Sequence, residues 1–350
     1  MTRPTTTGKA QDLITFTRST TGTYLGSDGL LKSAAINEAR IEYDASGNCL
    51  GLLVEEARTN VLTRSNEFLT APWNGSAGNV VSNIPSIDGG QCFKLSSNGG
   101  AADYWIQSGV ASNGQRKSIW ARTVSGTGTA HILGHNSVPA TLVTLTEEWQ
   151  RFSLNVGVGE AGGTNFYAVD FRGSNTLSEI LVFGAQLEQG TFPTSYIPTS
   201  GSAVTRAADV ASLAVSEFGY NQDQGTVFIN CLITEQPSSN LRVIDGDSNN
   251  KRWMYVNNPG DNFGLKYYDG TNNVTLVGSG IPLNMKAAVA VTPTQVFGAA
   301  NSSNVGSGAH SGTLLDISQF NFFANLTGHI KSVQYYPLRL SNAQLQALTV

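Results

Sequence analysis

The alternation of apolar and polar residues along short segments constrains this chain most. Phe152–Val158 alternates with a period of two, as a strand with one face toward solvent does. Val227–Ile233 and Ala287–Val291 are short, mostly apolar runs bounded by turn-forming residues, which favours strands buried inside a sandwich. Helical periodicity is nearly absent. The pattern therefore predicts an all-β protein built from antiparallel β-sandwiches.

Turn and cap signals support the same fold class. The strand-like segments Leu265–Tyr268 and Val274–Val277 flank an Asp269–Gly270 pair, which supplies the positive φ values that a tight hairpin needs. Near the C-terminus, Ser341 is followed three residues later by Gln344, the pattern of a capping box. We therefore expect one short C-terminal helix, which is too short to be stable unless it docks on a sheet.

Composition excludes several classes of protein. The chain has 350 residues, enough for two or three domains, and a formal net charge of −4 with no run of Lys or Arg. A nucleic-acid partner is therefore not expected, because such proteins need a basic face. The aliphatic runs are too short to span a bilayer, and the polar start of the chain does not resemble a secretion signal. The three cysteines lack metal-site spacing, and we expect them to be buried.

Two polar segments suggest domain boundaries. One is the polar stretch Thr63–Asn66, and the other is Phe192–Gly201, whose two prolines predict a stiff, extended connector. We therefore expect an N-terminal segment at 1–64, a first sandwich at 65–200 and a second sandwich at 201–350.

Three segments carry a resemblance to a known family. They are Phe16–Tyr24 with the following Asp28–Gly29 and Asn37–Arg40, then Gly51–Asn60, and finally Gly184–Thr199 running on to Thr205–Asp209. Their order and spacing resemble tailed-bacteriophage virion proteins of the tail-fibre, head-fibre or decoration type. The resemblance extends over roughly the first 210 residues.

The two expected sandwiches resemble different folds. Residues 65–200 are similar to a carbohydrate-binding-module jelly roll, through Trp73, Trp120–Arg122, Trp149–Phe152 and Ile180–Glu188. Residues 201–350 resemble a concanavalin A-like, laminin-G-type sandwich through the ending Gly328–Ser341.

The family resemblance implies a function. It implies a non-enzymatic virion structural protein, a fibre or capsid decoration, that contributes to host attachment and is made in the bacterial host cytoplasm. It also implies a homo-oligomer, with a trimer favoured. The first alternative is a lectin-like receptor-recognition protein that binds host lipopolysaccharide or capsule, and a weaker alternative is a polysaccharide depolymerase.

The N-terminal segment has its own prediction. Residues 1–64 hold few apolar residues for a closed core but contain strand signals at Leu13–Thr17 and Arg40–Tyr43. Because unpaired strand edges aggregate unless they are covered, we expect this segment to dock on another subunit or on other virion proteins.

Glycan binding needs flat aromatic faces with amide or carboxylate groups beside them. Trp120 and Trp149 lie within apolar alternation and are interpreted as core residues. The other aromatic and polar residues in or beside loops have two competing interpretations: they form a ligand-binding face, or they pack in the hydrophobic core. These candidates are Trp105, Trp253, Tyr255, Tyr267, Tyr268, Asn257, Asn258 and Asp261.

A calcium loop is the second chemical hypothesis. Asp245, Asp247 and Asn249 place oxygen ligands at alternate positions, as calcium loops do, whereas the competing interpretation is a plain turn. An EF-hand is excluded, because Asn250 and Val256 occupy the positions of its glycine and bidentate glutamate. No other cofactor is expected.

The sequence does not predict an enzyme. Adjacent carboxylates at Glu55 and Glu56 diverge in either a strand or a helix, so they do not flank one glycosidic bond together. The motifs of nucleophilic, nucleotide-binding and zinc-dependent enzymes are also absent from the sequence. We assign no catalytic residue.

Overall fold

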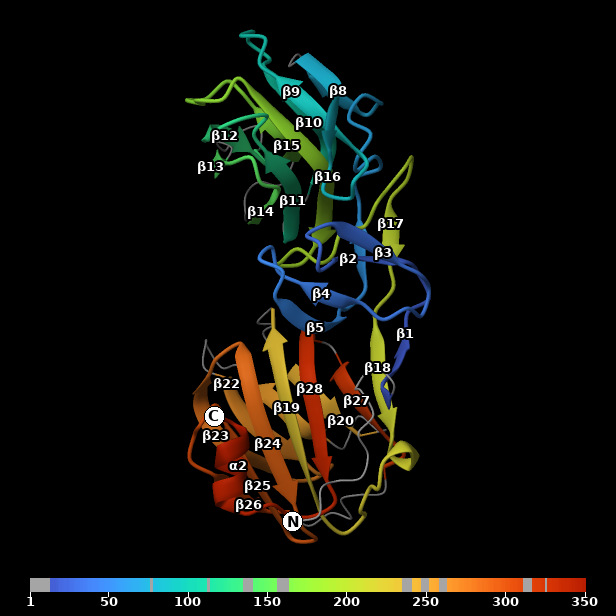
Figure 1. The fold of residues 1–350 in the computed structure, drawn as a ribbon, viewed down its shortest axis with the longest axis vertical. Coiled ribbons are helices and arrows are strands. Elements are labelled where there is room, and N and C mark those ends of the chain that lie inside the picture. The colour runs from blue at the N-terminus through green and yellow to red at the C-terminus, as the bar shows by residue number, and fades with distance from the viewer. Residues whose placement is uncertain are drawn as a thin grey trace. The chain divides into compact units, whose positions relative to one another are not determined.

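The computed structural model describes residues 13–75, 78–111, 114–134, 141–155, 164–234, 241–246, 252–257, 263–310, 317–324 and 326–350. Their regular secondary structure is nearly all antiparallel strand, with one 3₁₀ turn, η1 (Val215–Glu217), and the short C-terminal helix α2 (Asn342–Leu348), so the all-β prediction is confirmed (Figure 1). In the described part of the chain, no helix combines the length and the apolarity that a membrane span requires.

The chain forms two compact units from interleaved segments. The C-terminal unit takes the residues up to Thr20 together with Ala35–Glu56 and Ala208–Val350. The central unit takes Thr21–Ala34 and Ala57–Ala207. The residues before position 65 are therefore divided between the two units, which differs from the separate segment expected at 1–64.

The early strands find their partners within the same chain. The C-terminal unit receives β1 (Thr15–Thr17), β4 (Ile41–Tyr43) and β5 (Cys49–Val54), and the central unit receives β2 (Gly22–Leu25), β3 (Leu31–Ala34) and β6 (Arg58–Asn60). β1 pairs with β18 (Val210–Ala214), β5 pairs with β28 (Gly328–Tyr336), and β6 pairs with β17 (Val204–Arg206). Strands of the same chain therefore cover at least one edge of each of these strands, while β1 and β4 remain edge strands of their sheets. Docking on another subunit or on virion proteins stays a prediction.

Two seven-stranded sheets build the C-terminal unit. The hydrophobic core lies between them and joins Val227 and Ile229 of one sheet to Phe320 of the other. In the first sheet the order is β1, β18, β27 (Gln319–Ala324), β20 (Leu241–Asp245), β21 (Arg252–Asn257), β22 (Phe263–Tyr268) and β23 (Asn273–Ile281). In the second sheet the order is β26 (Gly306–Ala309), β25 (Gln295–Ala300), β24 (Asn284–Val291), β19 (Gly225–Ile233), β28, β5 and β4.

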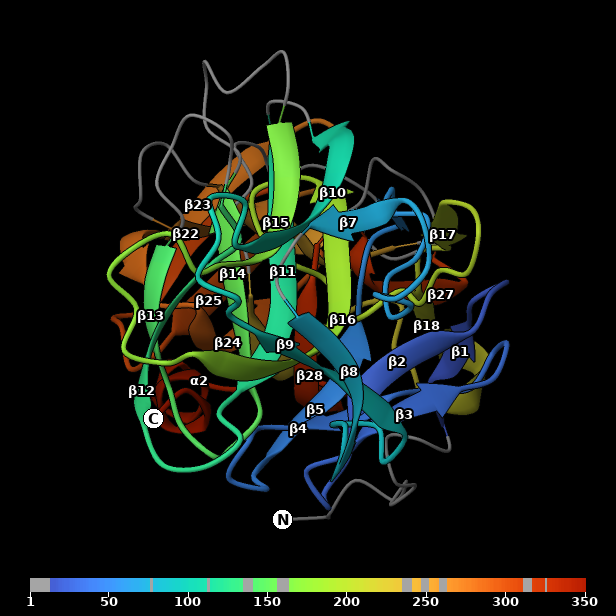
Figure 2. The same cartoon turned by 90° about the horizontal axis from the view of Figure 1, so that it is seen from above.

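Helix α2 covers the outer face of this second sheet, against β24 and β25 (Figures 1 and 2). Ala288 and Ala290 point to that face, and their small side chains leave room for Leu345 of the helix. The predicted capping box is confirmed, because Ser341 Oγ accepts from Gln344 N–H at 3.3 Å and Gln344 Oε1 accepts from Ser341 N–H at 2.8 Å.

Two five-stranded sheets build the central unit, and their shared core includes Ile119, Phe166 and Val182. The first has the order β13 (Thr141–Leu145), β12 (Gly128–Ile132), β15 (Thr164–Asp170), β10 (Tyr104–Ala111) and β7 (Trp73–Gly75). The second has the order β14 (Gln150–Asn155), β11 (Gln115–Arg122), β16 (Glu179–Gln189), β9 (Gln91–Ser96) and β8 (Gly78–Pro85).

The β2–β3 hairpin belongs to a second apolar cluster of the central unit. Leu25 and Leu31 pack there with Trp120 and Phe183, whose strands belong to the β14-to-β8 sheet. The segment Phe192–Gly201, which was predicted to be a stiff, extended connector between domains, packs into this unit. Its Tyr196 and Ile197 are buried.

Several local predictions hold. The hairpin of β22 and β23 is confirmed, as are the buried strands at Val227–Ile233 and Ala287–Val291. The strand predicted at Phe152–Val158 is present up to Asn155, and its last three residues lie outside the described residues. Cys92 and Cys231 are buried as expected, whereas Cys49 is exposed.

In each unit, one of the two sheets is packed on both faces. Its inner face packs on the core, and its outer face packs on α2 in the C-terminal unit or on the β2–β3 hairpin in the central unit. Among the described residues, no hydrophobic cluster lies on the outer face of the other sheet, which runs from β1 to β23 in the C-terminal unit and from β13 to β7 in the central unit. The outward-facing side chains of these two sheets are mainly polar and aromatic.

Candidate functional site

Trp105 does not form an exposed aromatic face. It is 8% exposed and belongs to the core of the central unit, and its indole N–H donates to the carbonyl of Phe68 at 2.9 Å. The strand that carries it turns alternate residues inward, so the neighbouring Tyr104 reaches the outer face instead.

The aromatic candidates of the C-terminal unit are divided between two faces. Trp253 and Tyr267 belong to the core between the sheets and are 1% and 2% exposed, so neither is available to a sugar ring. Tyr255 and Tyr268 lie outside that core cluster and both face the guanidinium of Arg252. Tyr255 is also only 1% exposed, so Tyr268 alone of the four is partly accessible. Simple alternation separates Tyr267 from Tyr268, but it would place Trp253 and Tyr255 on one face. The irregular register between Arg252 and Tyr255 separates this second pair.

The remaining candidates are placed as follows. Asp245 is buried and its carboxylate forms an ion pair with Arg242 at 3.4 Å. Burial raises the pKa of Asp245 to about 6. The described residues contain no group of three or more side chains suited to hold a metal ion. The backbone of Asn257 ends β21, while its side chain and Asp247, Asn249, Asn258 and Asp261 lie outside the described residues.

A row of polar residues crosses the first sheet of the C-terminal unit. Residues directly opposite each other on neighbouring strands share one face, and here every member is polar. The row reads Thr15, Ser212, Asn321, Asp245, Arg252, Tyr268 and Asn273. A second row on the same face reads Arg242, Tyr255, Lys266 and Thr275. We call these two rows the polar face.

The outer face of the β13-to-β7 sheet carries the other candidate cluster. Cross-strand pairing aligns Leu142, His131, Asp170 and Tyr104 in one row, and Arg172 follows directly after β15. The guanidinium of Arg172 lies 4.5 Å from the centre of the Tyr104 ring and 5.6 Å from that of Tyr167. We call Tyr104, Tyr167, Asp170 and Arg172 the tyrosine–arginine cluster.

A bidentate ion pair fixes this cluster. Arg172 donates from Nε to Asp170 Oδ1 at 2.8 Å and from its terminal nitrogen to Oδ2 at 2.7 Å. Burial acts to raise the pKa of Asp170, but the hydrogen bonds and charge of Arg172 outweigh it and hold that pKa below its usual value. The same hydrogen bonds raise the pKa of Arg172. Asp170 and Arg172 are therefore both charged, and the pair carries no net charge. The Arg172 side chain is 39% exposed.

Loop residues extend the cluster. His131 Nδ1 lies 2.8 Å from Asn175 Oδ1, and Asn175 donates its amide to the carbonyl of Asp170 at 3.2 Å. The sequence analysis missed this cluster, because its members come from three strands and a loop. The local signal was present in the alternation around Tyr104, which places it opposite to the buried Trp105.

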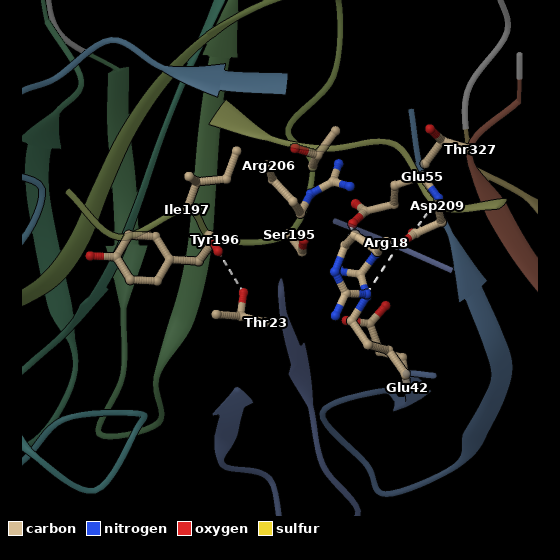
Figure 3. Close-up of polar contacts among 12 residues, drawn as sticks. Arg18, Thr23, Glu42, Glu55, Ser195, Tyr196, Ile197, Arg206, Asp209 and Thr327 are labelled. Atoms are coloured by element: carbon tan, nitrogen blue, oxygen red, sulfur yellow. Dashed lines mark hydrogen bonds and ion pairs between the residues drawn. The ribbon is translucent and has the colours of Figure 1, made fainter. Parts of the chain in front are cut away.

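The segments that carry the phage-family resemblance meet in a buried charge cluster. Arg18, Arg40, Glu55 and Asp209 come from these segments within the C-terminal unit, and their side chains are at most 3% exposed. Asp209 pairs with Arg40 and, at 3.2 Å, with Arg18 (Figure 3), while Arg40 bonds Glu55 at 2.8 Å. Two cations balance two anions, so the arrangement holds these segments together and leaves no charge for a substrate.

In the central unit, residues of the segments that carry the phage-family resemblance also join distant parts of the chain. The Asn60 amide donates to the carbonyls of Ala185 and Ile197 and accepts from the N–H groups of Leu187 and Leu62, at 2.9 to 3.2 Å. Nearby, Thr23 donates to the carbonyl of Tyr196 at 2.7 Å (Figure 3). These motif residues are therefore structural.

Comparison with known proteins gives no family. Neither a family model nor a curated protein matches the chain. Among solved structures, the carbohydrate-binding module CBM40 of a Ruminococcus gnavus IT-sialidase, bound to α2,3-sialyllactose, is 17% identical, with 37% of this chain and 84% of that chain covered and a TM-score of 0.30.

Two further structures are similar at the same level. The CBM22-1–CBM22-2 tandem domain of Paenibacillus barcinonensis Xyn10C is 10% identical, with 79% and 96% of the two chains covered and a TM-score of 0.25. The sialidase of Trypanosoma rangeli is 9% identical, with 91% and 60% covered and a TM-score of 0.32. TM-scores this low do not establish a shared fold, so the functional argument below is built from the chain's own side chains.

Proposed function

We propose that this protein is a non-enzymatic, glycan-binding component of a bacteriophage virion that contributes to attachment to the host surface. The observation that carries glycan binding is the tyrosine–arginine cluster on the outer face of the β13-to-β7 sheet. The virion assignment is supported by the resemblance of the segments between Phe16 and Asp209 to phage tail-fibre, head-fibre and decoration proteins.

The chemistry of the cluster suits an uncharged sugar. A carboxylate accepts hydrogen bonds and a guanidinium donates them, so Asp170 and Arg172 offer both roles to hydroxyl groups without a net charge. The aromatic rings of Tyr104 and Tyr167 meet edge to face at 5.3 Å and fix the wall beside them. Because the ion pair and the stacked guanidinium hold these groups in place, little side-chain entropy is lost when a ligand binds.

A binding role is supported over a catalytic one by the use of the buried carboxylates. Glu55 and Asp209 are held by Arg40, and Glu188 accepts from the backbone N–H and hydroxyl of Thr194 at 2.9 and 2.6 Å. A pair of carboxylates that flanks a glycosidic bond needs one member free to be protonated and another free to attack or to activate water. These groups serve the fold instead.

The test is a glycan array of host lipopolysaccharide and capsule fragments probed with the full chain. Tyr104→Ala and Arg172→Met are expected to lower binding by roughly tenfold or more, since charged hydrogen bonds and aromatic contacts of this kind are worth about 1–3 kcal/mol each. Tyr24→Ala removes a half-buried tyrosine elsewhere in the central unit and serves as the matched control. Glycan binding is refuted if the intact chain binds no glycan, or if both cluster variants bind like the control.

The virion role has its own test. Mass spectrometry of purified phage particles from a lysate that encodes this chain should detect it as a stoichiometric component, and an antibody should label one structure of the particle. Absence of the chain from intact particles would remove the virion assignment and leave the glycan-binding test untouched. Sedimentation of the purified chain tests the homo-oligomer, with a trimer expected.

A further inference from the structure

The polar face of the C-terminal unit contains a cation that lies against two tyrosine rings. In the first polar row, Arg252 lies opposite Asp245 on one side and Tyr268 on the other. Its guanidinium carbon is 5.5 Å from the ring centre of Tyr255 and 5.5 Å from that of Tyr268. Two aromatic rings therefore hold this cation on the outer face of the sheet.

The described residues give this guanidinium no hydrogen-bond acceptor. Its Nε is enclosed and has no partner in the described part of the chain, and no ion pair of Arg252 is formed there. By contrast, Arg172 is bonded to Asp170 and Arg242 to Asp245. Arg252 is half-buried and its terminal nitrogens are not enclosed, so they are the donors that an anion can reach.

The groups around Arg252 fit an acidic sugar. Half-buried Tyr268 supplies aromatic surface, and exposed Asn273 lies at the end of the same row. Tyr255 is 1% exposed, so it positions Arg252 and does not meet the ligand itself. A single anionic group beside aromatic surface and hydroxyl partners is the chemistry of a uronic acid or a similar carboxylated sugar.

We infer that the polar face binds a carboxylated polysaccharide, with the sugar carboxylate at Arg252 and the sugar chain along the cross-strand row. This inference extends the proposed glycan binding to a second site with a different ligand class. The guanidinium fork matches a carboxylate or a phosphate, and a polysaccharide can carry either, so the experiment must separate the two.

The experiment measures retention of the full chain by immobilised acidic polysaccharides, namely polygalacturonate, alginate, hyaluronate and polysialic acid. The same polymers with methyl-esterified carboxylates are the matched uncharged probes, and poly(glycerol phosphate) is the phosphate probe. At least one carboxylated polymer is expected to bind, its ester to bind roughly tenfold or more weaker, and the phosphate polymer to bind weaker than the carboxylate.

Variants of single residues assign the site. Arg252→Met keeps the apolar stem and is expected to lower binding of the carboxylated polymer by roughly 10- to 100-fold, and Arg252→Lys is expected to restore only part of it, because lysine lacks the fork. Arg339→Met is the control, since Arg339 also stacks on an aromatic ring, Phe297, at 3.9 Å in the same unit. Unchanged near-ultraviolet circular dichroism shows that each variant is folded.

The outcomes are decisive in both directions. Loss of binding in Arg252→Met with retention in Arg339→Met supports the site. No binding to any carboxylated polymer, equal binding to the esters, tighter binding to the phosphate polymer, or equal loss in both variants overturns it. Arg172→Met is expected to leave this binding unchanged, so failure here and failure of the neutral-glycan site are distinguishable.

Discussion

Arg40 and Asp209 lie 169 residues apart in the sequence and form an ion pair in which both side chains are completely buried. Although burial acts to lower the pKa of Arg40, the charges of Glu55 and Asp209 outweigh it and raise that pKa. The pair therefore remains ionised and depends on both partners.

Removal of one partner should destabilise the C-terminal unit strongly. Arg40→Met leaves Glu55 and Asp209 as buried carboxylates without their shared cation, and we expect a loss of about 3–5 kcal/mol in the free energy of unfolding. Urea denaturation followed by tryptophan fluorescence measures this loss. The control Lys32→Met breaks an exposed ion pair with Asp28, and its transition should coincide with that of the parent.

Asp245 should make stability fall as the pH rises. Burial raises its pKa from 3.8 to about 6, so between these values the folded state binds more protons than the unfolded state. Stability is therefore highest below about pH 4 for this group and decreases until the carboxyl is ionised above pH 6. Asp245→Asn should gain roughly 1–3 kcal/mol at pH 7.5 and little at pH 4. An equal effect of the substitution at both pH values would contradict this assignment.

The same carboxylate should control the affinity of the polar face for acidic sugars. Ionised Asp245 lies directly opposite Arg252 and repels an incoming carboxylate, whereas Arg242 and Lys266 on the same face attract it. Lowering the pH from 7.5 to 5 neutralises Asp245 and should tighten binding severalfold in a titration with a carboxylated oligosaccharide. In Asp245→Asn this pH dependence should disappear, and its persistence would point to another group.

Asn60 should be a stability determinant of the central unit. Its amide fills four hydrogen bonds to buried backbone groups, and Asn60→Leu leaves two carbonyls and two N–H groups without partners. We expect a loss of roughly 3 kcal/mol or more, measured by thermal unfolding. Asn342→Leu at the exposed start of α2 provides a comparison that should cost far less. Similar losses at the two positions would argue against this role.

Deletion of residues 1–64 should disrupt both units. It removes β1, β4 and β5 with Arg18 and Arg40 from one unit, and β2, β3 and β6 with Asn60 from the other. We expect the shortened chain to lose its cooperative unfolding transition and to be digested rapidly by protease. A stable, protease-resistant product would show instead that the first 64 residues form a separable segment.

The fold class and many local elements follow from the sequence because they depend on near neighbours. Alternation located β19 and β24, the Asp269–Gly270 pair located the hairpin of β22 and β23, and Ser341 with Gln344 located α2. The unit boundaries do not follow in this way. The pairing of β5 with β28 and of β1 with β18 joins segments nearly 200 or more residues apart, and no local pattern records such a partner.

The candidate sites show the same limit. Grouping Trp253, Tyr255, Tyr267 and Tyr268 by their closeness in sequence found the right sheet but mixed its two faces. The tyrosine–arginine cluster was missed because Tyr104 and Asp170 become neighbours only when β10 pairs with β15. A face is a property of strand register, and register between distant strands is fixed by the whole core.

The backbone crosses from one unit to the other at four places, after Thr20, Ala34, Glu56 and Ala207. A pulling force between the units is therefore shared by four covalent connections, and a single cut by a protease at any one of them leaves the two halves tethered. For the virion role proposed above, in which the protein would meet both shear and proteolysis, this threading would give redundancy that a single connection would lack.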